Sequence, residues 1–169
     1  MPRNVASRRQ PNRSRGALIG VGNPWMGDDA FGPRIVDRIA NQFPTLEAIQ
    51  CPLDASSLIA AWTDRPATFV VDAMLSGDRP GTVRCFEPAD LPPPRPGKRS
   101  STHGWGLRWA IALSERLGVL PTRLMIIGVA GRNFSPGTEL RLLDEAARTV
   151  ADCIENDLRR AAGRNAAFR

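Results

Sequence analysis

The chain has 169 residues, which is long enough for one domain with a complete hydrophobic core. Its formal net charge of +6 comes from its two ends: residues 1–16 and 159–169 carry nine arginines and no acidic residue, whereas the segment between them carries 14 basic and 17 acidic residues. The charge therefore gives no reason to expect the domain itself to bind nucleic acid, and no apolar run is long enough to cross a membrane.

We expect three segments: a basic, disordered extension over residues 1–16, a folded domain over 17–160 and a flexible basic tail over 161–169. The alternative for the first segment is an arm that contacts an acidic partner or nucleic acid. No apolar segment with a cleavage site follows the first arginines, and the three cysteines form no C-x-x-C motif. We therefore expect a cytoplasmic protein with isolated thiols and no cysteine zinc site or redox dithiol.

The first element predicted is a strand over residues 17–21, which the turn Gly22-Asn23-Pro24 ends. Apolar residues at a spacing of four then predict a helix that presents Phe31 to Phe43 on one face. Asp28 and Asp29 fall where this helix begins. The simplest interpretation is that one of them caps the helix, which leaves the other free to bind a cation in the loop crevice.

The glycines of this stretch do not form a phosphate-binding loop. Gly20, Gly22 and Gly27 are spaced G-x-G-x-x-x-x-G rather than G-x-G-x-x-G. The pair Asp28 and Asp29 would also repel a phosphate at the helix N-terminus, and no Gly-Lys-Ser/Thr sequence is present. Nucleotide binding is therefore disfavoured.

Further elements follow in chain order. Residues 46–51 are a weak strand candidate, Asp54 caps a short helix that buries Leu58, Ile59 and Trp62, and residues 67–74 form an apolar central strand. An edge strand over 82–86 and a proline-rich loop over 88–100 come next. A helix that ends before Gly118 follows, with one face formed by Leu107, Ala110, Ile111, Ser114 and Leu117. The last two elements are a strand over 124–130 and a helix with an apolar stripe from Leu140 to Leu158. The order predicts one α/β domain: a twisted, mostly parallel five-stranded sheet with helices on both faces.

Ligands bind such sheets beyond the carboxyl ends of the strands. Asp29 follows the first strand, Asp72 lies at the end of the central strand, and His103, the single histidine, lies in a loop just before a helix. Two carboxylates and an imidazole suit Zn²⁺ or Ni²⁺. Structural alternatives remain, because Asp72 could cap a turn and His103 could hydrogen-bond near a helix start. No G-x-S-x-G or H-E-x-x-H motif competes.

Several motifs occur together in one order. They are Gly20-Val21-Gly22-Asn23, Met26-Gly27-Asp28-Asp29-Ala30-Phe31-Gly32, Val71-Asp72-Ala73 with Pro80-Gly81-Thr82, and Ser101-Thr102-His103-Gly104. Over about residues 17–158 the sequence resembles the hydrogenase maturation endopeptidases, which process the large subunits of nickel–iron hydrogenases. The resemblance implies a peptidase that removes a short C-terminal extension from the large-subunit precursor once nickel has been inserted.

The resemblance also implies roles for individual residues. Asp29, Asp72 and His103 would be the metal-contacting and catalytic residues of an aspartic, metal-dependent type of peptidase, with water as the nucleophile. Supporting positions in the loops would be Gly22, Asn23, Gly27, Asp28 and Gly104. The metal would be the nickel of the precursor, although zinc or cadmium could occupy the same donors. We expect a monomer whose partner is the large-subunit precursor, with no nucleic acid and no membrane insertion.

The sequence departs from the family at Gln50-Cys51-Pro52-Leu53-Asp54, which lacks the glycine-rich turn of many relatives. The proline-rich residues 88–100, beside His103, are a candidate contact for the precursor. Two other functions stay open: another metallohydrolase on a similar sheet, and a non-catalytic chaperone that binds the nickel-loaded large subunit without cutting it.

Overall fold

The structure is a computed structural model that describes residues 15–52, 54–91, 102–135 and 142–166. The side chains of residues 102–105, 165 and 166 lie outside this description. The proline-rich segment from residue 92 to 101, Leu140 and the first 14 residues therefore lie outside what the structure tests.

A five-stranded sheet with the order β2-β1-β3-β5-β4 forms the centre of the described chain. The strands are β1 (Gly16–Val21), β2 (Leu46–Cys51), β3 (Thr68–Met74), β4 (Val83–Phe86) and β5 (Leu124–Ala130). The first four in spatial order are parallel, and β4 pairs antiparallel with β5. The predicted fold class is confirmed, including the central position of β3 and the edge position of β4.

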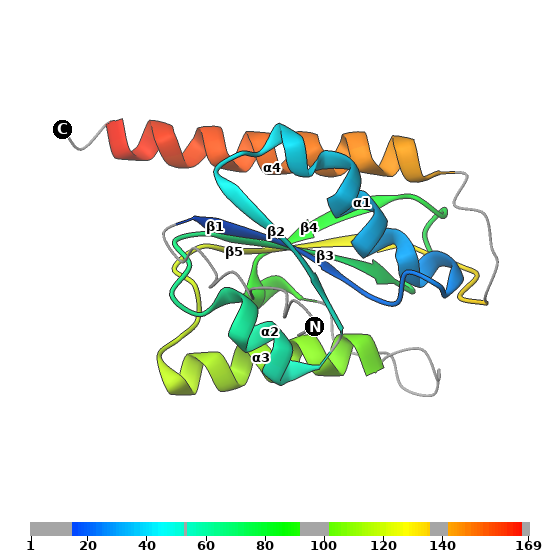
Figure 1. The fold of residues 1–169 in the computed structure, drawn as a ribbon, viewed down its shortest axis with the longest axis horizontal. Coiled ribbons are helices and arrows are strands. Elements are labelled where there is room, and N and C mark those ends of the chain that lie inside the picture. Colours follow the sequence, from blue (N-terminus) through cyan, green and yellow to red (C-terminus); the bar gives the residue numbers. More distant parts are fainter. Residues whose placement is uncertain (1–14, 53, 92–101, 136–141, 167–169) are drawn as a thin grey trace, which may run out of the picture.

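Helices cover both faces of the sheet (Figure 1). On one face lie α1 (Phe31–Ile39) and α4 (Leu143–Ala166), and on the other lie α2 (Ala55–Trp62) and α3 (Thr102–Leu117). Three short 3-10 turns, η1 (Gly27–Ala30), η2 (Ala40–Gln42) and η3 (Pro88–Asp90), complete the described elements. None of the described helices has both the length and the hydropathy that a membrane crossing needs.

The core is divided between the two faces because successive side chains of a strand point to opposite sides. In β3, Phe69 and Val71 pack into the cluster under α1 and α4, whereas Val70 packs into the cluster with α2 and α3. In this second layer the indole Nε1 of Trp62 donates a hydrogen bond to the hydroxyl oxygen of Ser114 at 3.0 Å. This buried bond joins α2 to α3.

Some predicted boundaries are wrong at the ends of helices. α1 ends at Ile39 and gives way to η2, although Phe43 is buried as expected. Leu117 is 60% exposed, because α3 ends there and Gly118 takes a positive φ of 68° that turns the chain away. Ile59 is only half-buried. α4 continues to Ala166, through the first part of the expected flexible tail.

Candidate functional site

The candidate site lies at the carboxyl edge of the sheet. β1 leads into η1 there, and β3 runs beside β1 with Gly20 opposite Val71. α3 precedes β5, so it runs against the parallel strands and begins at this same edge (Figure 1). The topology thus brings the segments that carry Asp29, Asp72 and His103 to one edge, as the sequence predicts.

The turn after β1 depends on Gly22. Its φ of 129° is a conformation that side chains disfavour, and a Cβ at this position would lie 2.1 Å from the backbone oxygen of Asp29. Gly22 therefore allows the backbone of the β1–η1 turn to pass directly against residue 29. This contact fixes where the Asp29 carboxylate is presented.

Asp29 is 8% exposed, and its carboxylate is held by the turn itself. Its Oδ2 accepts a hydrogen bond from the backbone N–H of Asn23 at 2.8 Å, and the side-chain oxygen of Asn23 accepts one from the N–H of Trp25 at 3.0 Å. Asn23 thus orders the turn from both sides. A carboxylate buried in this way and hydrogen-bonded by a backbone N–H has a fixed direction.

Asp28 points to a different loop. Its Oδ2 accepts hydrogen bonds from the backbone N–H groups of Arg132 at 2.6 Å and Asn133 at 2.7 Å, and its own N–H donates to the Asn133 carbonyl at 2.8 Å. The Asp28 carboxylate is therefore an anchor for the loop after β5.

The prediction that one of the two carboxylates caps the helix is wrong. The residue before η1 is Met26 and the residue before α1 is Ala30, and neither position has a side-chain cap. Asp28 and Asp29 lie inside η1, where their side chains bind N–H groups of other segments rather than of their own helix.

Asp72 lies on β3 and is 7% exposed. Strand alternation places it on the same face as Val70, which packs in the α2–α3 layer. η1, which contains Asp29, contacts β3. Asp72 is thus a second buried carboxylate at the carboxyl edge, on the side of the sheet that α3 covers.

His103 is the second residue of α3, so the structure places it inside the first turn of a helix rather than in the loop before it. Gly104 is the third residue of the same turn. The α3 N-terminus lies at the site's edge of the sheet, but the side chain of His103 is outside the described part of the structure. Its convergence with Asp29 and Asp72 remains a prediction.

A pocket of about 460 Å³ opens beside Asp29. It is lined by Gly22, Asn23, Pro24, Asp29, Gln50, Cys51 and Pro52. The lining thus combines the β1–η1 turn with the end of β2. The sequence predicts a strand that contains Gln50 and Cys51 but does not assign them to the site, because nothing local reveals that β2 pairs with β1 and brings them beside Asp29.

Cys51 is buried in this pocket wall and acts as a neutral thiol. Its Sγ donates a hydrogen bond to the carbonyl of Pro52 at 3.2 Å. Burial, with a smaller contribution from the charge of Asp54, raises the pKa of Cys51 to about 11. Cys51 is therefore protonated at neutral pH and supplies no negative charge to the site.

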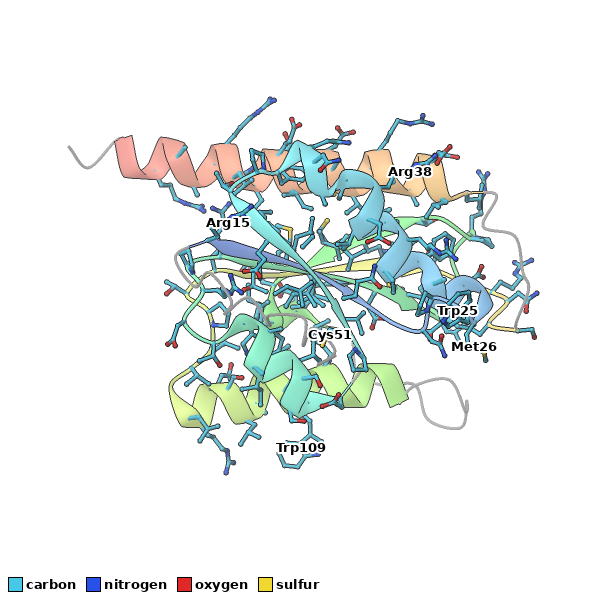
Figure 2. The ribbon with its side chains drawn as sticks, viewed as in Figure 1. Arg15, Trp25, Met26, Arg38, Cys51 and Trp109 are labelled. Atoms are coloured by element: carbon cyan, nitrogen blue, oxygen red, sulfur yellow. The ribbon has the colours of Figure 1, made fainter. Side chains whose placement is uncertain are left out.

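Trp25 and Met26 lie at the turn that borders the pocket (Figure 2). The side chain of Trp25 is 77% exposed, although indole is one of the largest apolar groups. In the part of the chain that the structure describes, no three Cys, His, Asp or Glu side chains are grouped as a metal site. Asp29 and Asp72 are oxygen donors that suit a divalent ion, and the third predicted donor is His103.

Comparison with known proteins gives one consistent result. Residues 33–159 match the sequence model of the hydrogenase maturation protease family. The hydrogenase expression/formation protein HupD of Rhodobacter capsulatus is 31% identical over 115 residues, which cover 66% of this chain and 54% of that protein. The hydrogenase 2 maturation protease of Escherichia coli K12 is 26% identical over 124 residues, which cover 70% of this chain and 74% of that protein.

The match spans about half of the length of the HupD protein. A solved structure, the hydrogenase maturating endopeptidase HybD from Escherichia coli, has a TM-score of 0.71 to this chain at 22% identity. The similarity covers 87% of this chain and 93% of HybD. At this level of identity the structural likeness establishes a shared fold.

Proposed function

This chain belongs to the hydrogenase maturation protease family, and from this premise we propose that it is an endopeptidase that removes a C-terminal extension from the large-subunit precursor of a nickel–iron hydrogenase. The observation that carries the proposal is the presentation of two buried carboxylates, Asp29 and Asp72, at one edge of the sheet. Such groups serve as metal ligands or general bases, and the pocket beside Asp29 provides room for a peptide segment.

In the proposed reaction the nickel of the precursor is part of the substrate. Asp29 and Asp72 engage this ion, with His103 as the third donor, and thereby position the peptide bond that is cut. Carboxylate and imidazole groups are suitable ligands for Ni²⁺. The hydrogen bond from Asn23 holds the Asp29 carboxylate in one direction, so this donor needs little rearrangement when the ion arrives.

Water is the proposed nucleophile, since no nucleophilic serine or cysteine is supported in the described part of the site. The thiol in the pocket, Cys51, remains protonated because its pKa is raised to about 11. A carboxylate that engages the precursor can instead accept a proton from water as it attacks the peptide carbonyl. Precursor without nickel lacks the ion that docks it, so cleavage reports that nickel is present.

The test is a cleavage assay with the purified chain and its large-subunit precursor, with and without nickel, read by the mass of the precursor. We expect loss of a C-terminal peptide only with nickel, and at least a 100-fold loss of rate in Asp29→Asn and Asp72→Asn, because each variant removes a charged group from the reaction centre. Asp152→Asn, an exposed change of the same chemistry on α4, is the matched control and should cut at the normal rate.

Three outcomes would contradict the proposal. Stable co-elution of the precursor without any change of its mass would favour a chaperone. Cleavage that is unaffected by Asp29→Asn would remove this carboxylate from the mechanism. A nickel-independent cleavage would favour a different metallohydrolase reaction on the same fold.

A further inference from the structure

Cys85 and Cys153 are far apart in the sequence but belong to elements that pack together. Cys85 lies on the edge strand β4, and Cys153 lies in the middle of α4. The sequence predicts isolated thiols, because no C-x-x-C motif is present. The structure places two of these thiols on elements that are in contact, β4 and α4.

The register of the sheet shows which way Cys85 points. Cys85 is directly opposite Ile127 in the antiparallel pair of β4 and β5, and directly opposed residues project from the same face. Ile127 packs in the core cluster that includes Val150 and Ile154 of α4. Cys85 therefore faces the layer occupied by α4.

Cys153 lies on the side of α4 that faces the sheet. It immediately precedes Ile154 and follows Val150 by three residues, which is one turn of helix. It is half-buried, whereas Cys85 is exposed and open to solvent. The two thiols thus lie at the solvent-accessible edge of the contact between β4 and α4, where small solutes can reach them.

The two neighbouring thiols shift each other's pKa in opposite directions. The neighbouring Cys85 thiol lowers the pKa of Cys153 to about 7. Conversely, Cys153, with smaller contributions from desolvation of the thiol and the charge of Asp157, raises the pKa of Cys85. The neighbouring carboxylates Asp152 and Asp157 oppose a negative charge here, but Asp157 is itself paired with Arg123. Of the two sulfurs, that of Cys153 is therefore the one that carries the thiolate more readily.

We propose that Cys85 and Cys153 form a thiol pair that a hydroperoxide converts into a disulfide between β4 and α4. The Cys153 thiolate attacks the peroxide oxygen, which breaks the O–O bond, forms a sulfenic acid on Cys153 and releases hydroxide or alkoxide. The Cys85 thiol then loses its proton and attacks the Cys153 sulfur, which forms the S–S bond and releases water. Starting from the Cys153 thiolate and the Cys85 thiol, the pair loses two electrons and one proton, and the peroxide is reduced to water and hydroxide or alkoxide.

The third cysteine is an internal control. Cys51 is buried, lies in the wall of the pocket, and has a pKa raised to about 11. It has neither the thiolate character nor a neighbouring cysteine that the reaction requires. The proposal therefore predicts modification of one pair and sparing of the third thiol.

The full chain can be treated with hydrogen peroxide, alkylated and digested with trypsin without reduction. Cleavage after Arg84, Lys98, Arg148 and Arg159 releases Cys85 in peptide 85–98 and Cys153 in peptide 149–159. We expect these two peptides as one disulfide-linked species in monomeric protein, with Cys51 alkylated. Cys51→Ser, the matched control, should form the same species at the same rate.

Two variants separate the roles of the two sulfurs. In Cys85→Ser, Cys153 should react with peroxide and accumulate as a sulfenic acid that dimedone traps. In Cys153→Ser, Cys85 should form no disulfide within the chain and should yield less dimedone adduct than Cys153 does in Cys85→Ser, because desolvation and the charge of Asp157, which both raise the pKa of Cys85, remain in this variant. Oxidised parent protein should also melt several degrees higher than reduced protein, a difference absent in both variants.

The proposal is overturned if peroxide oxidises Cys153 to sulfinic acid without forming the linked peptides. It is equally overturned if the linked species contains Cys51 or joins two chains. Neither result bears on the proposed peptidase activity, because Cys85 and Cys153 lie outside the pocket beside Asp29.

Discussion

At the scale of single residues, the adjacent carboxylates of Asp28 and Asp29 serve different tasks. Asp29 faces the pocket and is held by Asn23, whereas Asp28 binds two N–H groups of the loop after β5. The sequence predicts that this pair matters, because two carboxylates follow a turn between a strand and a helix. It cannot predict the partners of Asp28, since Arg132 and Asn133 are brought there only by the pairing of the strands.

Asp28→Ala should destabilise the protein by about 2 kcal/mol, because it leaves two N–H groups of the 132–133 loop without their acceptor. Asp28→Asn keeps an oxygen acceptor, so its free energy of unfolding should fall by less than half of that amount. The free energy of unfolding in urea measures both changes. Equal losses in the two variants would show that the charge of Asp28, rather than its role as an acceptor, stabilises the loop.

At the scale of elements, the most regular patterns are the best predicted. β3 and β5 are apolar runs buried on both faces, and their predicted ranges agree closely with the structure. The end of α1 differs from the prediction, because the apolar spacing of four continues past Ile39 to Phe43. The side chain of Phe43 is buried, although the α-helix has given way to the 3-10 turn η2 before it. Periodicity reports burial, and burial does not require an α-helix.

The α2 cap is a predicted feature that the structure confirms. The Asp54 carboxylate accepts hydrogen bonds from the Ser57 N–H at 2.8 Å and from the Ser56 hydroxyl at 2.5 Å. These bonds lower the pKa of Asp54 from 3.8 to about 2. A lowered pKa in the folded state means that the stabilisation is complete above about pH 5 and is lost as the pH falls through the range from about 4 to 2.

Asp54→Ala should therefore lower the melting temperature at pH 7, and the difference from the parent protein should shrink as the pH approaches 2. Asp54→Ser keeps a capping oxygen but does not titrate, so its melting temperature should differ from that of Asp54→Ala by a constant amount across the same range. A difference between parent and Asp54→Ala that persists unchanged at pH 2 would contradict the ionised cap.

At the scale of the whole molecule, the strand order explains why the site could be predicted in outline. Asp29 follows β1 and Asp72 lies near the end of β3, and the carboxyl ends of parallel strands always share an edge. Cys85 and Cys153 could not be predicted to meet, because their contact depends on β4 reversing direction beside β5 and on α4 crossing that edge. A contact that follows from the shared carboxyl edge of parallel strands can be predicted from the sequence. A contact that depends on the pairing of several elements cannot.

The two core layers share the sheet, so we expect them to unfold together. Ile127→Ala should cost about 3 kcal/mol, because Ile127 is fully buried in the layer under α1 and α4. The midpoint of urea unfolding measured by tryptophan fluorescence, which includes Trp62 in the opposite layer, should fall by the same amount as the midpoint measured by circular dichroism. The exposed control Leu117→Ala should change stability by less than about 0.5 kcal/mol. Separated transitions would show that the layers are independent.

The position of α4 has a consequence for synthesis on the ribosome. The strands β1, β2 and β3 are neighbours in space and are all made before residue 75, so three of the five strands can pair early. Yet Phe69 and Val71 pack in the layer that α4 completes, and α4 is the last element to be made. Between the synthesis of β3 and that of α4, the nascent chain therefore exposes the part of this apolar face that α1 does not cover, and a chaperone that shields growing chains would act there.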